Sequence, residues 1–296
     1  MAAPVDGVLL VDKPEGLGST QALGAARRAL AIRKAGHTGT LDPFATGLLP
    51  LVFGEATKFS RFLLDADKRY LATLRLGATS TTGDTEGEIN EIGSVSVTLG
   101  DVEPVLASLR GAQSQIPPMH SAVRVEGRRL YDLARQGVEI PRAPRDIVIH
   151  ELESESIDGE KLVISVKCSK GTYVRTLAEE IGRRLGCGAY LTGLRRTAIG
   201  RLSVGDAHGL AELAALGPDA ARERLLPTGI LVAGLPRIDL PARESWAIRN
   251  GQVLVAPGGA PSADCALFDP EGAFIGVGTV ASGRLSASRL LNTGHG

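Results

Sequence analysis

The hydrophobic residues change their spacing close to the N-terminus, from that of a strand to that of a helix, and this change limits the possible folds. Residues 7–11 form an apolar run that is typical of a buried strand, and a Pro/Gly turn follows it. The next segment, 19–30, has the pattern of an amphipathic helix, with Ser19 placed to act as its N-cap. A buried strand followed at once by a helix predicts an α/β protein.

Further segments continue this mixture of periods. Two segments alternate apolar and polar residues as strands do, 70–76 and 161–168. Four segments have helical patterns: 101–109, 129–135, 174–185, which Gly186 closes, and a stretch near 207–225. Between these elements, 78–88 (ATSTTGDTEGE) is a polar Gly/Thr loop in a position to move or to touch a ligand.

The composition changes after residue 234. Gly, Pro and short apolar runs separated by turns predominate there, as in WAIRNGQVLVA, CALFDPEGAFIGVGTV and RLSASRLL. This pattern predicts a small β-rich domain. We therefore expect a first domain over 1–234 and a second over 235–292, with the final NTGHG frayed.

Bulk properties exclude several classes of protein. The chain has 296 residues, 43% hydrophobic and 22% charged, which is ordinary for a globular protein. No apolar run approaches the ~18 residues of a membrane span, and the N-terminus has no basic segment typical of a signal peptide, so a cytoplasmic location is expected. The three cysteines are far apart in the sequence and have no metal-ligand spacing, which argues against disulfides and structural zinc.

The net charge is zero, so overall charge does not indicate a nucleic-acid partner, but the basic residues are clustered. Such clusters either contact phosphates or form ordinary solvated faces. The clusters are Arg27/Arg28/Arg33/Lys34, Arg124/Arg128/Arg129, Lys167/Lys170/Arg175, Arg183/Arg184 and Arg195/Arg196/Arg201.

The segment 36–50, GHTGTLDPFATGLLP, carries the clearest chemical signal. Its glycines allow close approach of the backbone to a ligand, and Pro43 keeps Asp42 out of the helical region, so that a carboxylate projects from a loop. A common alternative is that Asp42 caps a short helix with Pro43 at its first position. Local chemistry leaves both interpretations open.

Other catalytic motifs are absent from the sequence. It contains no GxxxxGK[ST] phosphate loop, no GxSxG elbow, no HExxH helix and no GxGxxG after a strand. A carboxylate that needs no cofactor is the chemistry that remains.

GHTGTLDPFATGLLP resembles the signature of the TruB family of tRNA pseudouridine-55 synthases. Other segments resemble that family in the same order, so the similarity covers nearly the whole chain. They are GVLLVDKPEGLGS, GEATKFSRFLLDADKRY, QIPPMHSA, YDLARQGVEIPR, CSKGTYVRTLAEEIGRRLGCGAYLTGLRR and a C-terminal stretch similar to a PUA-like RNA-binding module.

The resemblance implies roles for particular residues. Asp42 would be the catalytic carboxylate that acts on the ribose, and Arg175 would hold it charged. Tyr70 would stack on the target base and assist proton transfer at C5. Tyr173 and Leu194 would line the uridine pocket, and His37 would contact the RNA loop. Lys13 is expected to support the site structurally.

The resemblance also implies the fold, the partner and the absence of any cofactor or metal. The expected fold is a mixed, largely antiparallel central sheet flanked by helices, with the small β-rich module added. The expected partner is the T-arm of tRNA, bound by a monomer that extrudes the target base. Two alternatives remain: a tRNA-folding chaperone and a synthase that acts on ribosomal RNA. His120 stands where the family often has tyrosine, which puts the RNA contact of that loop in doubt.

Overall fold

The structure is a computed structural model that describes residues 5–119, 121, 124–125, 128–129, 136, 138 and 140–292. The predicted helix at 129–135, His120 and the final NTGHG fall wholly or largely outside the described residues.

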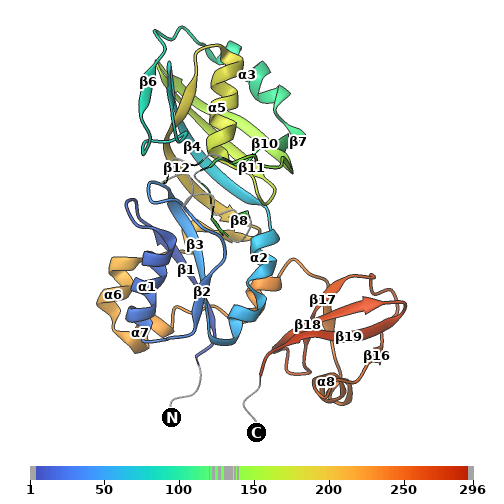
Figure 1. The fold of residues 1–296 in the computed structure, drawn as a ribbon. Helices are drawn as coiled ribbons and strands as arrows, with labels where there is room; N and C mark the ends of the chain where they lie inside the picture. Colours follow the sequence, from blue (N-terminus) through green and yellow to red (C-terminus); the bar gives the residue numbers. More distant parts are fainter. Residues whose placement is uncertain are drawn as a thin grey trace.

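A ten-stranded mixed sheet forms the centre of the molecule (Figure 1). Its main path runs β14-β1-β3-β12-β4-β11-β10-β7, with β2 added to β3 and β13 to β12. Neighbouring strands are antiparallel except for β1 with β14 and β3 with β12, so the expected largely antiparallel sheet is confirmed. The strands are β1 (Gly7–Lys13), β2 (Ala35–His37), β3 (Thr46–Phe53), β4 (Lys68–Leu76), β7 (Gly111–Gln115), β10 (Arg145–Asp158), β11 (Lys161–Cys168), β12 (Ala189–Ile199), β13 (Leu202–Ser203) and β14 (His208–Gly209).

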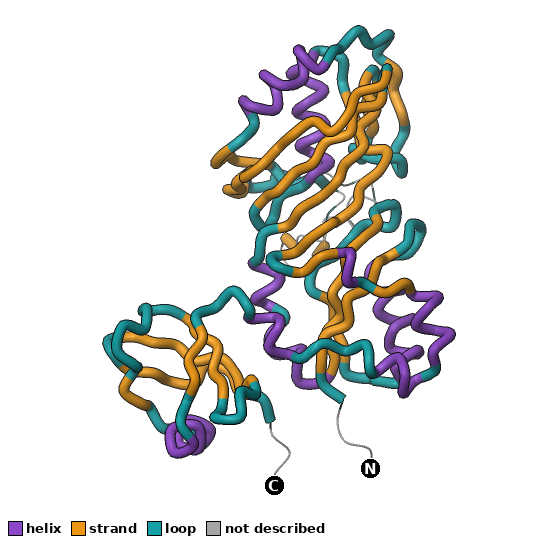
Figure 2. The backbone as a smooth tube through the Cα atoms, turned by 180° about the vertical axis from the view of Figure 1, so that it is seen from behind, coloured by secondary structure: helices purple, strands orange, loops and turns teal. Residues whose placement is uncertain are grey.

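Helices pack on this sheet in two groups. Helices α3 (Leu99–Ser108) and α5 (Val174–Leu185) cover β4, β10 and β11, where Val102, Leu177 and Ile181 are buried against the strands. At the other end, α1 (Ser19–Leu30), α6 (Leu210–Leu216) and α7 (Pro218–Arg222) cover β1 and β3. Figure 2 shows the opposite face of the long strands, which carries no helix over its centre.

Two helix ends show how well the sequence specifies local structure. Gly186 closes α5 with φ 77°, a conformation that glycine adopts without strain, as predicted. The N-cap of α1 is Gly18, so the expectation for Ser19 is wrong. The Ser19 hydroxyl instead exchanges hydrogen bonds with the backbone of Leu41, at 2.9 Å to its oxygen and 2.7 Å from its nitrogen.

Small elements connect the larger ones. They are a 3-10 turn η1 (Gly54–Phe59), α2 (Arg61–Asp65), the hairpin of β5 (Ala78–Ser80) and β6 (Ile89–Glu91), the pair β8 (Arg124–Val125) and β9 (Arg128–Arg129), and the 3-10 turns η2 (Val204–Asp206) and η3 (Thr228–Val232).

The C-terminal region forms a second, five-stranded sheet, which confirms the predicted β-rich character. The order is β15-β17-β18-β19-β16. Within WAIRNGQVLVA, however, Trp246–Arg249 belong to a helix that the strand-and-turn interpretation missed. The elements are β15 (Arg237–Asp239), α8 (Ala242–Arg249), β16 (Leu254–Val255), β17 (Asp264–Phe268), β18 (Phe274–Ala281) and β19 (Arg284–Leu290).

This second sheet packs against the region around η1 and α2. Phe59 meets Phe274 edge to face with ring centroids 5.2 Å apart, and Arg61 pairs with Asp264 at 3.1 Å. An apolar contact flanked by an ion pair fixes one orientation of the module against the larger sheet.

Candidate active site

The loop that carries Asp42 connects β2 to β3 and is fixed to the protein at several points. Thr38 N donates to Pro50 O at 3.1 Å, and Ser19 holds Leu41 as described above. Ala45 N donates to Asp42 O at 3.1 Å, which closes a turn, and no helix begins at Pro43. The helix-cap interpretation of Asp42 is therefore wrong, and its side chain projects from a loop.

Lys13 supports this loop through hydrogen bonds to backbone oxygens. Its ammonium group donates to Pro14 O at 2.8 Å, Leu17 O at 2.6 Å and Pro43 O at 3.3 Å. Burial lowers the pKa of Lys13 to about 8, an effect that the charge of Asp42 opposes. Lys13 thus contacts backbone around the Asp42 loop, in keeping with the structural role expected for it.

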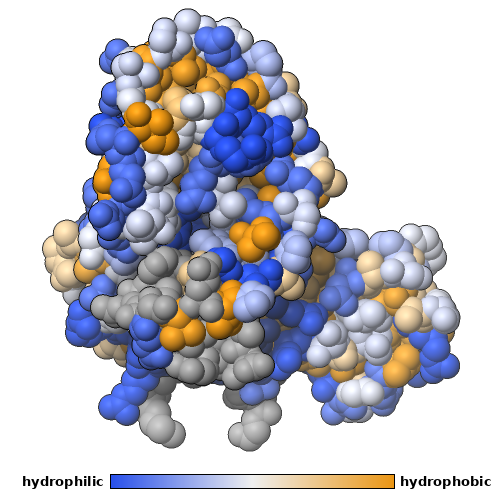
Figure 3. Space-filling model, turned by 45° about the horizontal axis from the view of Figure 1, so that its top comes forward, coloured by the Kyte–Doolittle hydropathy of each residue, from blue (hydrophilic) through white to orange (hydrophobic). Residues whose placement is uncertain are grey.

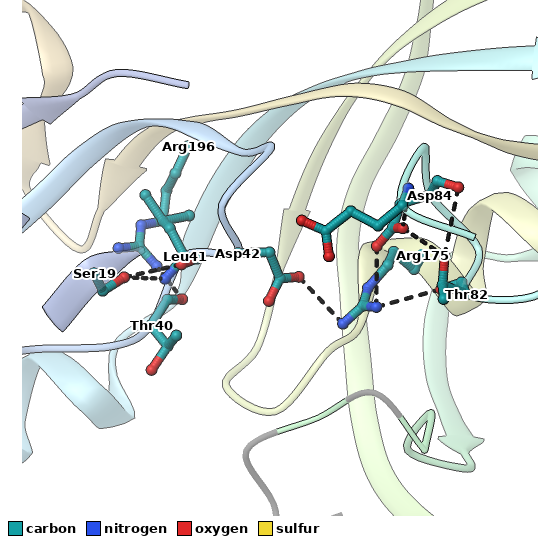
Figure 4. A network of polar contacts seen from close by, with 9 residues as sticks. Ser19, Thr40, Leu41, Asp42, Thr82, Asp84, Arg175 and Arg196 are labelled. Atoms are coloured by element: carbon teal, nitrogen blue, oxygen red, sulfur yellow. Dashed lines mark hydrogen bonds and ion pairs between the residues drawn. The ribbon is translucent and has the colours of Figure 1, made fainter. Parts of the chain in front are cut away.

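Asp42 lies against Arg175, as the sequence comparison predicted. Arg175 Nη2 is 3.1 Å from Asp42 Oδ2, and Arg175 Nη1 is 3.1 Å from Asp84 Oδ2 (Figure 4). The Arg175 and Asp84 side chains are only 6% and 2% exposed, whereas Asp42 keeps 39%. One guanidinium is therefore anchored by a buried carboxylate and presents its other edge to the open one.

Sequence reasoning missed Asp84. It belongs to the polar loop 78–88, and its carboxylate also accepts hydrogen bonds from Thr82 Oγ1 at 2.5 Å and Glu86 N at 3.0 Å. The polar Gly/Thr pattern of the loop predicts that it could move or touch a ligand, but nothing in that pattern marks this acid rather than its neighbours. The pairing with Arg175 joins residues 91 positions apart in the chain.

Burial raises the pKa of Asp42 above its ordinary value. The charges of Arg175 and Lys13 oppose this rise, and Asp84 adds to it. Arg175 thus acts in the expected direction, but the loss of hydration outweighs it, because the pocket walls surround the carboxylate even though part of its surface stays open. A raised pKa places the ionisation of Asp42 nearer to neutrality than that of a free aspartate.

A pocket of about 280 Å³ opens beside Asp42 and brings together five of the six predicted site residues. Its lining includes Asp42, Tyr70, Tyr173, Arg175 and Leu194, and also Lys68, Cys168 and Arg196, which sequence reasoning did not assign to the site. The Gln115 side chain makes two hydrogen bonds to the backbone of Tyr173. Tyr173 N donates to Gln115 Oε1 at 2.7 Å, and Gln115 Nε2 donates to Tyr173 O at 3.0 Å. The walls thus combine aromatic, aliphatic and cationic groups around one carboxylate.

His37 does not line this pocket. It lies on β2, and its Nδ1 is buried without a hydrogen-bond partner in the described part of the chain. Burial and the nearby charge of Arg196 lower the pKa of His37, so the ring is neutral at pH 7. Its expected contact with RNA remains a prediction.

The basic clusters of the sequence are placed very differently in space. Arg196 is buried, so its guanidinium does not reach a surface phosphate. Its neighbour Arg195 pairs with Asp12 at 2.7 Å. Arg183 and Arg184 both pair with Glu180. By contrast, Arg27, Arg28 and Arg33 line a surface hollow of about 520 Å³, with no acidic partner among the described residues.

The described residues contain neither a cluster of metal ligands nor a candidate membrane span. No group of three or more His, Cys, Asp or Glu side chains is arranged to hold a metal ion. No helix there is long and apolar enough to cross a membrane. The face in Figure 3 is mostly hydrophilic, with apolar residues in small separate groups.

The fold is shared with solved structures of Cbf5. A Cbf5-Nop10-Gar1 complex matches with a TM-score of 0.74 at 23% identity, over 96% of this chain and 84% of the other. A Nop10-Cbf5 complex of an archaeal box H/ACA sRNP matches with a TM-score of 0.71 at 22% identity, over 96% and 85%. The chain therefore has the fold of Cbf5.

Family models and curated relatives identify the chain more closely. Residues 27–174 match the model described as TruB family pseudouridylate synthase (N terminal domain), and 175–233 and 236–291 match two TruB C-terminal models. The chain is 51% identical to tRNA pseudouridine synthase B of Aromatoleum aromaticum, over 98% of this chain and 94% of the relative. It is 49% identical to the enzyme of the same name from Thiobacillus denitrificans, over 98% and 97%. The chain belongs to the TruB family of pseudouridylate synthases.

Proposed function

We propose that this chain isomerises uridine 55 in the T-loop of tRNA to pseudouridine, with Asp42 as the catalytic carboxylate. One observation carries the assignment of Asp42: its side chain opens into the pocket while Arg175 holds it from the protein side at 3.1 Å. Family membership supports uridine isomerisation, and the named relatives are tRNA enzymes.

The reaction requires little beyond what this pocket contains. The C1′–N1 bond of the uridine breaks, the uracil turns, and a C1′–C5 bond forms while the C5 proton is lost and N1 gains one. The ionised Asp42 meets the ribose, either attacking C1′ or removing the C2′ proton. A single carboxylate suffices because no water has to be activated and the leaving base is retained.

The dimensions of the pocket support base extrusion. A volume of about 280 Å³ suits one nucleotide rather than a stacked helix. Extrusion costs a few kcal/mol in lost stacking, and contact of the base with Tyr70 and Leu194 would offset this cost. Tyr173, which also lines the pocket, would add a further aromatic contact.

The remaining parts of the proposal concern the whole molecule. Residues 1–234 would form the catalytic domain, and 235–292 a PUA-like module that adds contacts to the RNA backbone. The protein would act as a monomer in the cytoplasm, where its tRNA substrate is found. The hollow lined by Arg27, Arg28 and Arg33 would meet phosphates, since unpaired guanidinium groups attract them.

The experiment that tests this function is to map pseudouridine in tRNA and ribosomal RNA from cells with and without the gene, and in purified T-arm stem-loops treated with the protein. Pseudouridine at position 55, present only with the protein, is expected. Modification confined to ribosomal RNA would identify a different synthase. RNA binding and refolding without any isomerisation would identify a chaperone.

A further inference from the structure

One apolar side chain of the pocket is open to solvent. Leu64, on α2, lines the pocket beside Asp42 and is 43% exposed. Among the large hydrophobic side chains that line this pocket in the described part of the chain, it alone is exposed, and the others are buried or half-buried. Leu64 also lies against the Asp42 loop, because a Cβ atom built on Gly39 would be 4.0 Å from Leu64 Cδ2. An apolar group therefore stands at the open side of the site, next to the carboxylate.

Hydrogen bonds from a buried lysine fix the end of α2 and with it the direction of Leu64. The ammonium group of Lys68 donates to Leu64 O and to Ala66 O, both at 2.6 Å. It also donates to Leu63 O at 3.2 Å. The helix ends at Asp65, so these oxygens have no partner in a further helical turn. Leu63 is 5% exposed and packs into the core, which leaves Leu64 directed toward the pocket.

An ion pair joins the end of α2 to a second part of the pocket wall. Asp65 Oδ1 lies 2.8 Å from Lys170 Nζ, and Ser169 and Gly171 on either side of Lys170 line the pocket. The two charged side chains are 60% and 63% exposed, so the pair adds little to stability. It does limit how far α2 and this segment can separate. Leu64 thus keeps its place relative to the pocket.

The reaction proposed above requires water to be kept away from the ribose. When the C1′–N1 bond breaks, C1′ stays open to attack until C5 of the same uracil bonds to it. A water molecule that reached C1′ first would form a C1′–OH bond, its proton would go to N1, and the uracil would leave as the free base. The products would be uracil and an abasic site in the RNA. Since Asp42 is a carboxylate that could assist this hydrolysis, apolar walls have to exclude the water.

We propose that Leu64 is a substrate-contact residue that packs against the extruded nucleotide on its ribose side and keeps water from C1′, and that Lys68 is the positioning residue that holds Leu64 there. This inference rests on the proposed function. Contact with the nucleotide would remove the exposed apolar surface of Leu64 from water, which is favourable. An aliphatic side chain makes no directional bond, so the uracil can turn in the pocket while the contact persists.

The first test measures how Leu64→Ala divides its products. Single turnovers at saturating enzyme are followed on a T-arm stem-loop with a radiolabelled uracil ring at the target position, and pseudouridine is separated from released uracil. Pseudouridine should form about tenfold more slowly, the effect of losing roughly two buried CH₂ contacts. Released uracil, with a matching number of abasic sites, should rise at least about tenfold above the wild-type level. Uracil release at the wild-type level, whether or not the rate falls, would overturn the proposal.

Leu71→Ala is the matched control. Leu71 is 39% exposed, does not line the pocket, and leaves β4 on the face opposite to its neighbour Tyr70. Its replacement should change neither the rate nor the uracil released. Equal uracil release by Leu71→Ala would show that general loosening of the fold admits water, and would overturn the role of Leu64. If the wild type forms no pseudouridine on this RNA, the proposed function itself fails.

Two further variants separate the contact from its support. Lys68→Met keeps much of the side-chain length but loses the donors, so it should release uracil as Leu64→Ala does, with faster hydrogen exchange in α2. A folded Lys68→Met protein that releases no uracil would overturn the positioning role. Leu64→Met keeps the apolar volume and should retain the wild-type products, a comparison that does not depend on whether Lys68→Met folds. Equal uracil release by Leu64→Met and Leu64→Ala would show that apolar volume does not exclude the water, and would overturn the proposal.

Discussion

Replacing Asp84 by Asn tests whether the buried end of the Arg175 pair is essential. Asp84 Oδ1 accepts hydrogen bonds from Thr82 and Glu86, whereas Oδ2 faces Arg175 at 3.1 Å. An asparagine that keeps the first two bonds turns its NH₂ group toward the guanidinium, donor against donor. Breaking a buried pair costs about 3–5 kcal/mol, and the retained bonds favour the lower end, about 3 kcal/mol.

The expected results are a melting temperature lower by about 6–12 °C and a single-turnover rate lower by about a hundredfold, the loss typical of a group displaced by ~1 Å. Differential scanning calorimetry and quench-flow on a T-arm stem-loop measure them. Asp12→Asn is the control, because it breaks a partly exposed Asp–Arg pair. It should lower the free energy of unfolding by no more than about 1 kcal/mol and leave the single-turnover rate unchanged. Wild-type stability and rate in Asp84→Asn would refute the dependence of Arg175 on Asp84.

The same variant has a defined effect on pH dependence. The rate requires ionised Asp42, so it falls as pH drops through the pKa of Asp42, which is raised in the wild type. Asp84 contributes to that rise, and removing its charge should move the acid limb to lower pH. A limb that moves upward would show that the loss of order at Arg175 outweighs the removal of the negative charge.

Three further results are expected. Changing Arg27, Arg28 and Arg33 together to Gln should weaken RNA binding. The slope of log K against the logarithm of the salt concentration should become less steep by up to about 0.9 for each of three lost phosphate contacts. An unchanged slope would exclude this hollow from the RNA interface. Burial raises the pKa of Cys168 to about 11. Alkylation of this thiol at neutral pH should therefore be slower than that of a free cysteine by on the order of hundreds of times, the ratio of their thiolate fractions. Equal alkylation rates would contradict the burial of Cys168. At pH 7 the Asp42→Asn variant should melt at the wild-type temperature or above it. A carboxyl whose pKa is raised in the folded protein lowers stability progressively as pH rises from its unfolded pKa through its folded pKa. A melting temperature many degrees lower would show a structural role for Asp42.

The elements with a strong local period could be predicted from the sequence. Strand β11 alternates buried residues with exposed or partly buried ones along its length, and α5 ends at Gly186 as its pattern requires. Helix α8 was missed because it is short and lies among Gly- and Pro-rich turns. Residues 242–249 carry a weak helical signal that the surrounding composition obscures.

The site residues also divide into those that a local sequence motif reveals and those that it does not. Asp42 and Arg175 were found because they stand in long motifs, whereas Asp84 and Arg196 depend on contacts between distant segments. Arg196 was grouped with its neighbours as a surface basic cluster. Only the side-chain alternation of β12 places it inside while Arg195 faces out, and that strand had not been predicted.

A comparison of Asp42→Asn with the wild type, for both pseudouridine formation and T-arm binding, tests the role of Asp42 with the fewest assumptions. In the proposed reaction the ionised Asp42 acts on the ribose, while other residues hold the RNA. Affinity within about twofold of the wild type, with no pseudouridine formed in a single turnover, is the predicted result. Normal turnover by Asp42→Asn, or loss of binding in step with loss of activity, would contradict the account.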